Sequence, residues 1–400
     1  MSDVDLKSEF HSDKLHGTRE RESVLVDAPT PAPARRRLAV RPGTVAVAAG
    51  LVALLVMPIY LTGFWLGVGL FSMSAALGAI GLNLLMGTAG QLSLGHAFFV
   101  AVGAYGYAWF AGDSGRQGTV DLHGLGLPPV LAFVLAVLLA GLAGVLFSPI
   151  SGRMRGLYLA VATLALVYIG HHVLLNAKPV TGGFNGRRIP EMEVFGFAFG
   201  DGSPDTLLVA GVPFERLERL WYLGLLLVAV GWLLARNMLR GRPGRALAGL
   251  RDNELAASVM GVPVARYRAA AFTVSSMYAG AAGVLLGLVY ERIVPDSFGI
   301  MISINFIAMI VIGGLGSVGG AVAGAVFVSA LPLVLGHYAE WLPLVVPAGM
   351  EAAGVSPVEA SNYLYGAAII VILVFAPGGL AGTAQSLTAR LRRVVRRGEP

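Results

Sequence analysis

The chain has 400 residues, of which 56% are hydrophobic and only 13% charged, with a formal net charge of +6 at pH 7. Soluble domains carry about 25% charged residues, so this composition excludes an ordinary soluble protein. Cysteine is absent, which excludes disulfides, iron–sulfur clusters and thiolate metal sites. Apolar runs long enough to cross a hydrocarbon core of about 30 Å as helices recur, and short alternating strands do not. The sequence therefore predicts an all-α polytopic membrane protein.

In chain order, residues 1–43 are polar, mixed in charge and proline-containing, which predicts a disordered tail. Residues 44–380 form the predicted transmembrane domain, and 381–400 a basic tail. About ten transmembrane helices are expected, interrupted by Gly-rich segments that make some of them discontinuous. The expected spans are 44–62, 66–86, 90–111, 128–150, 157–175, 220–239, 268–290, 299–313, 320–336 and 362–377.

The distribution of basic residues predicts the orientation. Ten spans place both termini on one side of the membrane, and four segments then share that side: 35–41, 153–155, 236–268 and 390–397. These hold four, two, seven and five arginines, eighteen in all, whereas the opposite side holds seven basic residues. By the positive-inside rule, both termini are expected in the cytoplasm of a multi-pass protein in the bacterial inner or plasma membrane.

Two Gly-rich stretches, Gly81–Ala97 and Gly313–Gly320, are the expected helix breaks. Polar side chains at membrane depth avoid lipid, so those near the breaks are candidates to line a translocation path. Each could instead make a helix–helix hydrogen bond, worth about 0.6 kcal/mol on average in membranes. The expected breaks are Gly87, Gly90, Gly95, Gly313, Gly314 and Gly316, and the candidate path residues are Asn83, Gln91, Ser93, His96, Ser303 and Asn305.

A catalytic or nucleotide site is not expected in this chain. A P-loop needs a lysine directly after its glycines, and the only lysines are Lys7, Lys14 and Lys178. The pair His171-His172 has no carboxylate nearby in sequence, so an interfacial polar pair is favoured over a metal site. No acid–base constellation or intramembrane proton relay is evident. We therefore expect no bound cofactor or metal, no nucleic-acid partner and no enzyme activity.

The polar segment 240–268, which we call the coupling segment, is the expected docking site for an energy-supplying partner. Residues 245–260 are rich in helix formers and are followed by Gly261 and Pro263 as stop signals. On one helix Leu247, Leu250, Glu254, Ala257 and Gly261 would share a face. Such a face could insert into a groove of another protein. An amphipathic helix on the membrane surface is the alternative, since the arginines would suit it as well.

Several motifs in order resemble branched-chain amino-acid ABC permeases of the LivM type. They are GRALAGLRDNELAASVMGVPVARYRAAAF in the coupling segment, Leu82–His96, Tyr158–Ala165, Thr181–Gly186 and Ile312–Gly320. Within the first, Glu254–Gly261 looks like the EAA…G loop of ABC importers with one residue added. The likeness covers about residues 45–380.

The resemblance implies a transmembrane subunit paired with a homologous second permease. It also implies two cytoplasmic ATPase subunits that carry ATP and Mg²⁺, and an external substrate-binding protein. The residues that it assigns to ATPase coupling are Arg245, Arg251, Asn253, Glu254, Ala256, Ala257 and Gly261.

The substrate stays open at this stage. A substrate carboxylate, as on an amino acid, could meet free amides near Gln91–Gly95. A urea or short-amide ABC permease would share the same motifs, and uncharged path residues suit urea as well. A stand-alone channel or secondary carrier is the alternative from a different class, and it predicts transport without ATP.

Overall fold

The computed structural model describes residues 42–117, 120–154, 156–194, 196–200, 207–209, 212–341, 354–376, 378–383 and 386. The chain divides into two compact units, Met1–Ala53 and Leu54–Pro400, and the described part of the first is the beginning of helix α1 (Pro42–Tyr60). Of the predicted tail at 1–43, all but the last two residues lie outside the described ranges. Most of the predicted tail at 381–400 lies outside them as well.

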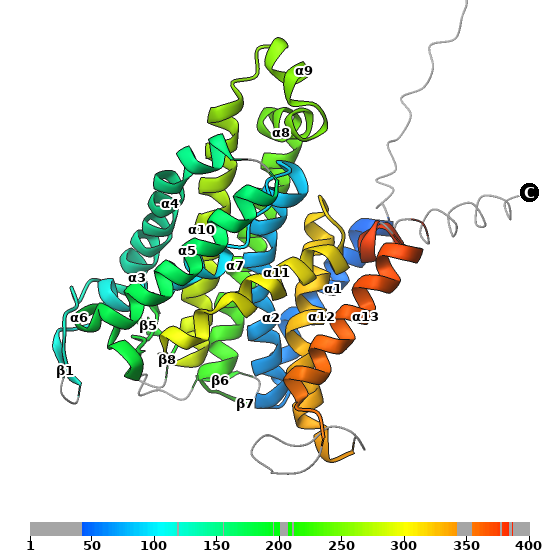
Figure 1. The fold of residues 1–400 in the computed structure, drawn as a ribbon. Helices are drawn as coiled ribbons and strands as arrows, with labels where there is room; N and C mark the ends of the chain where they lie inside the picture. Colours follow the sequence, from blue (N-terminus) through cyan, green and yellow to red (C-terminus); the bar gives the residue numbers. More distant parts are fainter. Residues whose placement is uncertain are drawn as a thin grey trace, which may run out of the picture. The chain divides into compact units, whose positions relative to one another are not determined.

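Each of the ten predicted spans coincides with a helix (Figure 1). After α1 these are α2 (Gly63–Leu82), α3 (His96–Ala111), α4 (Pro129–Arg153), α5 (Leu157–Asn176), α7 (Arg216–Arg240), α10 (Val264–Tyr290), α11 (Ile300–Gly313), α12 (Val318–His337) and α13 (Pro357–Phe375). Within the described ranges, seven helical segments are long and apolar enough to cross a membrane. Helix α3 is not among them, because it begins at His96 and has 16 residues. The chain is an all-α polytopic membrane protein.

Helix α2 is the centre of the packing in the unit that begins at Leu54. Its sequence is apolar on every side, which is the pattern of a helix surrounded by other helices. Leu66, Leu70, Ala79 and Ile80 are all fully buried. Helices α7, α10, α11 and α12 contact α2, and α10 also packs against α3 and α4.

Small residues set how closely these helices approach. A Cβ added at Gly103 of α3 would lie 2.2 Å from the carbonyl oxygen of Gly280 of α10. One added at Gly283 would lie 1.9 Å from the oxygen of Val100. With no hydrophobic force between helices in lipid, such close backbone contact is a main source of association.

The polar connections gather at the two ends of the long helices. At one end, uppermost in Figure 1, α8 (Arg242–Asp252) and α9 (Glu254–Val259) join α7 to α10. The other end holds α6 (Lys178–Thr181), the short helices η2 (Gly183–Asn185), η3 (Pro295–Phe298) and η4 (Ala339–Trp341), and small strands.

The described strands form four antiparallel pairs of two or three residues per strand, too short to change the fold class. They are β1 (Gly115–Gln117) with β2 (Val120–Leu122), β3 (Arg187–Arg188) with β8 (Arg292–Ile293), β4 (Glu193–Val194) with β5 (Phe197–Ala198), and β6 (Leu207–Val209) with β7 (Val212–Phe214).

Candidate functional site

The first Gly-rich break begins as a widened helical turn. Helix α2 continues into the π-helix η1 (Asn83–Thr88), a form that is rare and concentrated at functional sites. Beyond it Gly90 has a φ of 68°, and the backbone is non-helical until Gly95 precedes α3. The structure thus interrupts the helix at Gly90 and begins the next helix after Gly95. Gly87 lies inside η1 instead. Glycine is required there because neighbouring atoms leave no room for a Cβ, and not because of its backbone conformation.

The second break lies directly against the first. Gly314 and Gly316 have φ values of 109° and 84° and separate α11 from α12. The Gly316 amide donates to Asn83 Oδ1 over 2.8 Å. A Cβ added at Gly87 would lie 2.4 Å from that same oxygen and 2.4 Å from the Gly316 nitrogen. The sequence analysis did not foresee this contact, since the two breaks are more than 200 residues apart.

Three of the candidate path residues make internal hydrogen bonds. His96 Nε2 lies 2.9 Å from the Gly78 carbonyl oxygen. Ser303 Oγ accepts from the Ala97 amide over 3.0 Å, and Ser93 Oγ accepts from the Gly95 amide over 3.3 Å. All three side chains are buried. Their hydrogen bonds shape the first break and hold α2, α3 and α11 together.

Gln91 differs from them. It is only 4% exposed, and neither its side-chain oxygen nor its nitrogen has a hydrogen-bond partner among the described residues. The Asn83 Nδ2 atom is buried without a partner in the same way. Leaving such a group unsatisfied costs about 1–3 kcal/mol, so these two amides are the candidates with a chemical reason to meet a passing polar group.

A cavity of about 290 Å³ lies among α2, α3, α10, α11 and α12. Its polar lining groups are those of Ser74, Asn305 and Ser329 and the hydroxyl of Tyr290, and the rest of the lining is apolar or aromatic. The two serine hydroxyls donate to backbone oxygens of Ala282 and Ala325. The half-buried Asn305 amide makes no hydrogen bond within the described residues. The cavity therefore offers a small, uncharged, mainly apolar space with one free amide.

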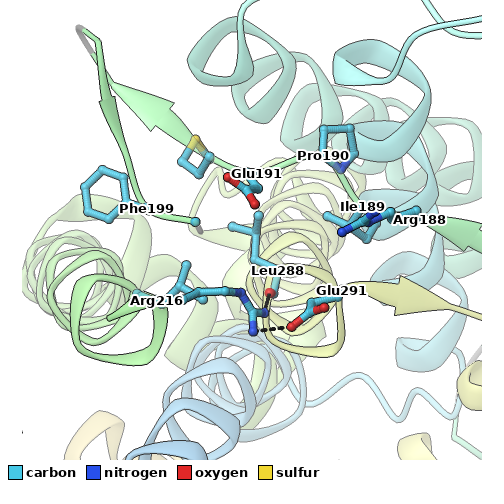
Figure 2. A pocket seen from close by; sticks show the side chains of 11 residues that line it. Arg188, Ile189, Pro190, Glu191, Phe199, Arg216, Leu288 and Glu291 are labelled. Carbon is cyan, nitrogen blue, oxygen red and sulfur yellow. Dashed lines mark hydrogen bonds and ion pairs between the residues drawn. The ribbon is translucent and has the colours of Figure 1, made fainter. Parts of the chain in front are cut away.

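One cluster of charged groups at the strand-bearing end, around Arg216 and Glu291, encloses far less space. Figure 2 shows Arg216 donating to the Leu288 carbonyl oxygen, over 2.6 Å, and forming an ion pair with Glu291. These contacts cap the carboxyl end of α10, where a cation is favourable. The pocket beside them has a volume of about 30 Å³, which is roughly that of one water molecule. This cluster is too small to hold a substrate.

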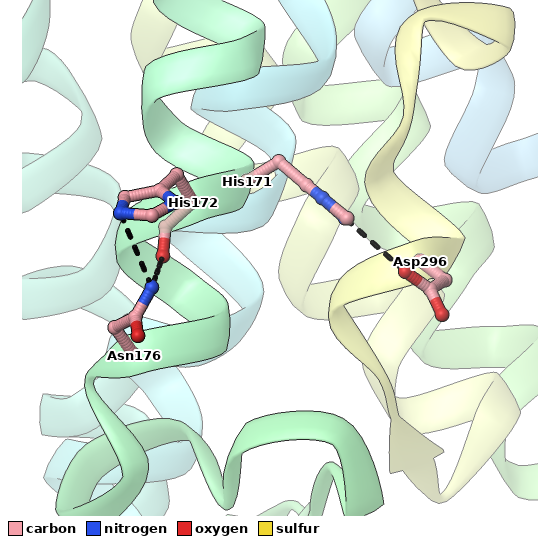
Figure 3. A network of polar contacts seen from close by, with 4 residues as sticks. All are labelled: His171, His172, Asn176 and Asp296. Carbon is pink, nitrogen blue, oxygen red and sulfur yellow. Dashed lines mark hydrogen bonds and ion pairs between the residues drawn. The ribbon is translucent and has the colours of Figure 1, made fainter.

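The two neighbouring histidines point to different partners (Figure 3). His171 Nε2 lies 3.1 Å from an oxygen of Asp296, whereas His172 faces Asn176 on its own helix. No group of three or more His, Cys, Asp or Glu side chains that could hold a metal ion occurs within the described ranges.

The coupling segment corrects one prediction. Residues 245–260 do not form one helix, because Asn253 ends α8 and caps α9 by accepting from the Ala256 amide over 3.0 Å. Leu247, Leu250 and Ala257, which were expected on the docking face, are buried against the chain itself. The large apolar side chains of this segment that are exposed are Leu255, Val259 and Met260, at 79%, 88% and 84% exposure.

The other coupling candidates have defined positions. Glu254 accepts from Arg268 of α10 over 2.8 Å, and Gly261 turns the chain after α9 with a φ of 84°. Arg245 is exposed and donates to the Arg240 carbonyl oxygen over 3.3 Å. The fourth, Arg251, reaches the first break, where its Nη1 donates to the Gly87 carbonyl oxygen.

Comparison with known proteins agrees with these features. The family described as "Branched-chain amino acid transport system / permease component" matches residues 64–373. The chain is 35% identical over 256 residues to the high-affinity branched-chain amino acid transport system permease protein LivM of Salmonella typhimurium, covering 62% of this chain and 58% of that protein. It is 35% identical over 247 residues to LivM of Escherichia coli, covering 60% of this chain and 56% of that protein.

A third relative is aligned over more of its length. It is the probable branched-chain amino acid transport permease protein LivM of Methanocaldococcus jannaschii, 23% identical over 342 residues, with 79% of this chain and 93% of that protein covered. The alignment thus spans less than two thirds of the two bacterial relatives but nearly all of the archaeal one. No solved structure matches this chain.

Proposed function

The chain belongs to the permease-component family of branched-chain amino acid transport systems, and from this premise we propose that it is a transmembrane subunit of an ABC importer. The proposed subunit translocates branched-chain amino acids that an external binding protein delivers. The observation that carries the proposal is the family match over residues 64–373, which begins in α2 and ends in α13. The match therefore includes both breaks, the cavity and the coupling segment.

The proposed partners are a homologous second permease, two cytoplasmic ATPases that hold ATP and Mg²⁺, and the binding protein. The ATPase contact is assigned to the end that carries α8 and α9. Leu255, Val259 and Met260 form an exposed apolar patch on and just beyond α9, which we call the α9 patch. Apolar side chains exposed this strongly on a polar connection mark a surface that a protein partner or the membrane covers, and we assign this one to the ATPases.

The 290 Å³ cavity supports an aliphatic amino acid over urea as the substrate. Typical ligand pockets of about 300–1,000 Å³ take drug-sized molecules, so this one suits a smaller molecule. Its lining is mainly apolar and none of its described lining residues is charged. The aliphatic side chain of such an amino acid gains free energy by burial against this surface, whereas urea has no alkyl group to bury there.

Reconstituted uptake tests the proposal. The chain is placed in liposomes with the second permease, the two ATPases and the binding protein, and uptake of labelled leucine is followed. We expect ATP-dependent uptake that excess unlabelled valine or isoleucine suppresses and urea does not. Leucine uptake by the chain alone without ATP would favour a carrier or channel, and competition by urea would favour the short-amide alternative.

The proposed orientation predicts opposite labelling of two cysteines. We expect Gly115→Cys to react with an impermeant maleimide from outside the cell and Arg242→Cys only after the membrane is opened. Gly115 lies in β1 and has no atom within 4 Å of an added Cβ, whereas at the nearby Gly112 a Cβ would meet Arg187 Nη2 at 2.6 Å. The native chain has no cysteine to interfere. Labelling of both positions from one side would contradict this orientation.

A further inference from the structure

Arg251 of the coupling segment meets the two helix breaks at one point. Its Nη1 donates to the Gly87 carbonyl oxygen in η1. A Cβ added at Gly90 would lie 3.2 Å from Arg251 Cγ, so the backbone of the first break lies against the aliphatic part of this side chain. A Cβ added at Gly316 would lie 3.7 Å from Arg251 Nη1, so the second break also lies beside this guanidinium. We call Arg251, Asn83, Gly87, Gly90 and Gly316 the junction.

The bond satisfies a specific chemical need. Gly87 is in the last turn of the continuous α2–η1 helix, where carbonyl oxygens lack helical donors and carry partial negative charge. The backbone hydrogen bonds that end this helix run from Ala89 to Leu84 and from Gln91 to Leu85. A guanidinium supplies the missing donor and a favourable positive charge together.

The junction also has a route to the cavity. Asn83 Oδ1, one turn before Gly87, holds the Gly316 amide over 2.8 Å. Gly316 follows α11, and the same helix carries Ile302, Asn305, Phe306 and Met309 of the cavity lining. A displacement of Arg251 therefore acts on one break by a direct bond. The same displacement acts on the second break through Asn83. In this way it also reaches α11, the helix that lines the cavity.

We propose that Arg251 is a positioning residue for transport that ties the coupling segment to both breaks, so that movement of α8 and α9 shifts them together. The inference rests on the proposed function, because it takes the force on α8 and α9 to come from the ATPases. It gives Arg251 a different role from the one expected on an ATPase-facing surface: its guanidinium contacts the permease's own backbone.

The test compares three variants of the full chain in the reconstituted importer. Arg251→Ala removes the bond, Arg251→Lys keeps the charge without the planar fork, and Arg153→Ala removes an exposed arginine at the end of α4, outside the coupling segment, as the control. Leucine taken up and ATP hydrolysed are measured in the same vesicles. Coupling between sites commonly amounts to roughly 5–150-fold.

We expect Arg251→Ala to lower leucine transported per ATP by about fivefold or more while the ATPase rate and assembly are kept. Arg251→Lys should recover part of the ratio, and Arg153→Ala should match the wild type. Hydrogen exchange of the purified chain gives a second readout. Peptides covering 84–92 and 312–318 should exchange faster in Arg251→Ala than in Arg153→Ala, because the junction has lost its bond.

The outcomes separate the two claims. A wild-type importer without ATP-driven leucine uptake would overturn the proposed function. A working wild type whose Arg251→Ala variant keeps the same ratio of leucine to ATP would overturn the role of Arg251 alone. A lower melting temperature or faster exchange with an unchanged ratio would assign Arg251 to simple helix capping, and would overturn the inference as well.

Discussion

Gly283→Val is expected to abolish accumulation of folded protein. The Cβ of any residue at this position would lie 1.9 Å from the carbonyl oxygen of Val100 and 3.1 Å from the Ala104 nitrogen. Both are backbone atoms of α3, so no side chain can rotate away and the two helices must separate. Overpacking typically costs about 1–3 kcal/mol and occasionally more, a large part of a marginal stability. The yield of monodisperse protein in detergent measures the effect.

Gly366→Val is the matched control for this prediction. Gly366 lies within α13, and no atom lies within 4 Å of an added Cβ there. The control variant should elute and melt like the wild type, since it adds the same side chain to a membrane helix without a clash. If Gly283→Val is equally abundant and equally stable, the close crossing of α3 and α10 is wrong.

Charged substitutions in the α9 patch are expected to abolish ATP-driven uptake while the permease stays folded. Val259 and Met260 are each more than 80% exposed, so aspartate at both positions disturbs no internal packing. In a closed interface the same change leaves charges buried without partners. Truncation of a central interface residue costs about 2 kcal/mol or more, so we expect at least a roughly thirtyfold loss of uptake.

Co-purification of the ATPases with the double variant gives the direct measurement. Gly152→Asp, which adds the same charge in the last turn of α4, where no atom lies within 4 Å of an added Cβ, is the control and should retain both ATPases and uptake. Loss of the permease itself from the membrane would point to a folding role for the α9 patch. Retained ATPases with normal uptake would contradict the proposed docking surface.

The sequence predicted the positions of the helices because lipid imposes a simple rule. Each helix that crosses the membrane needs about 20 apolar residues, so apolar runs of that length in the sequence mark the helices directly. All ten predicted spans coincide with helices. The glycine pattern likewise predicted discontinuities. The backbone leaves helical geometry at Gly90, Gly314 and Gly316, which have positive φ values, and Gly95 precedes α3, whereas Gly313 is the last residue of α11.

The face of the coupling segment was predicted wrongly for a local reason. A single helical periodicity does not hold across Asn253, because the side chain of this residue accepts from the Ala256 amide and so ends one helix and begins another. The change of direction turns Leu247, Leu250 and Ala257 inward and leaves Leu255 and Val259 exposed. Asparagine followed by glutamate was the available signal for a helix start.

The sequence by itself determined that this is a polytopic helical membrane protein, where its helices lie and that two of them are interrupted. These properties follow from composition and local periodicity, which act over a few turns of chain. Only the tertiary structure decided that the two breaks touch through Asn83 and Gly316, and that Arg251 joins them to the coupling segment. Such contacts depend on the close approach of backbones that glycine permits between elements far apart in the chain, and a local pattern carries no information about which partner will fill that space.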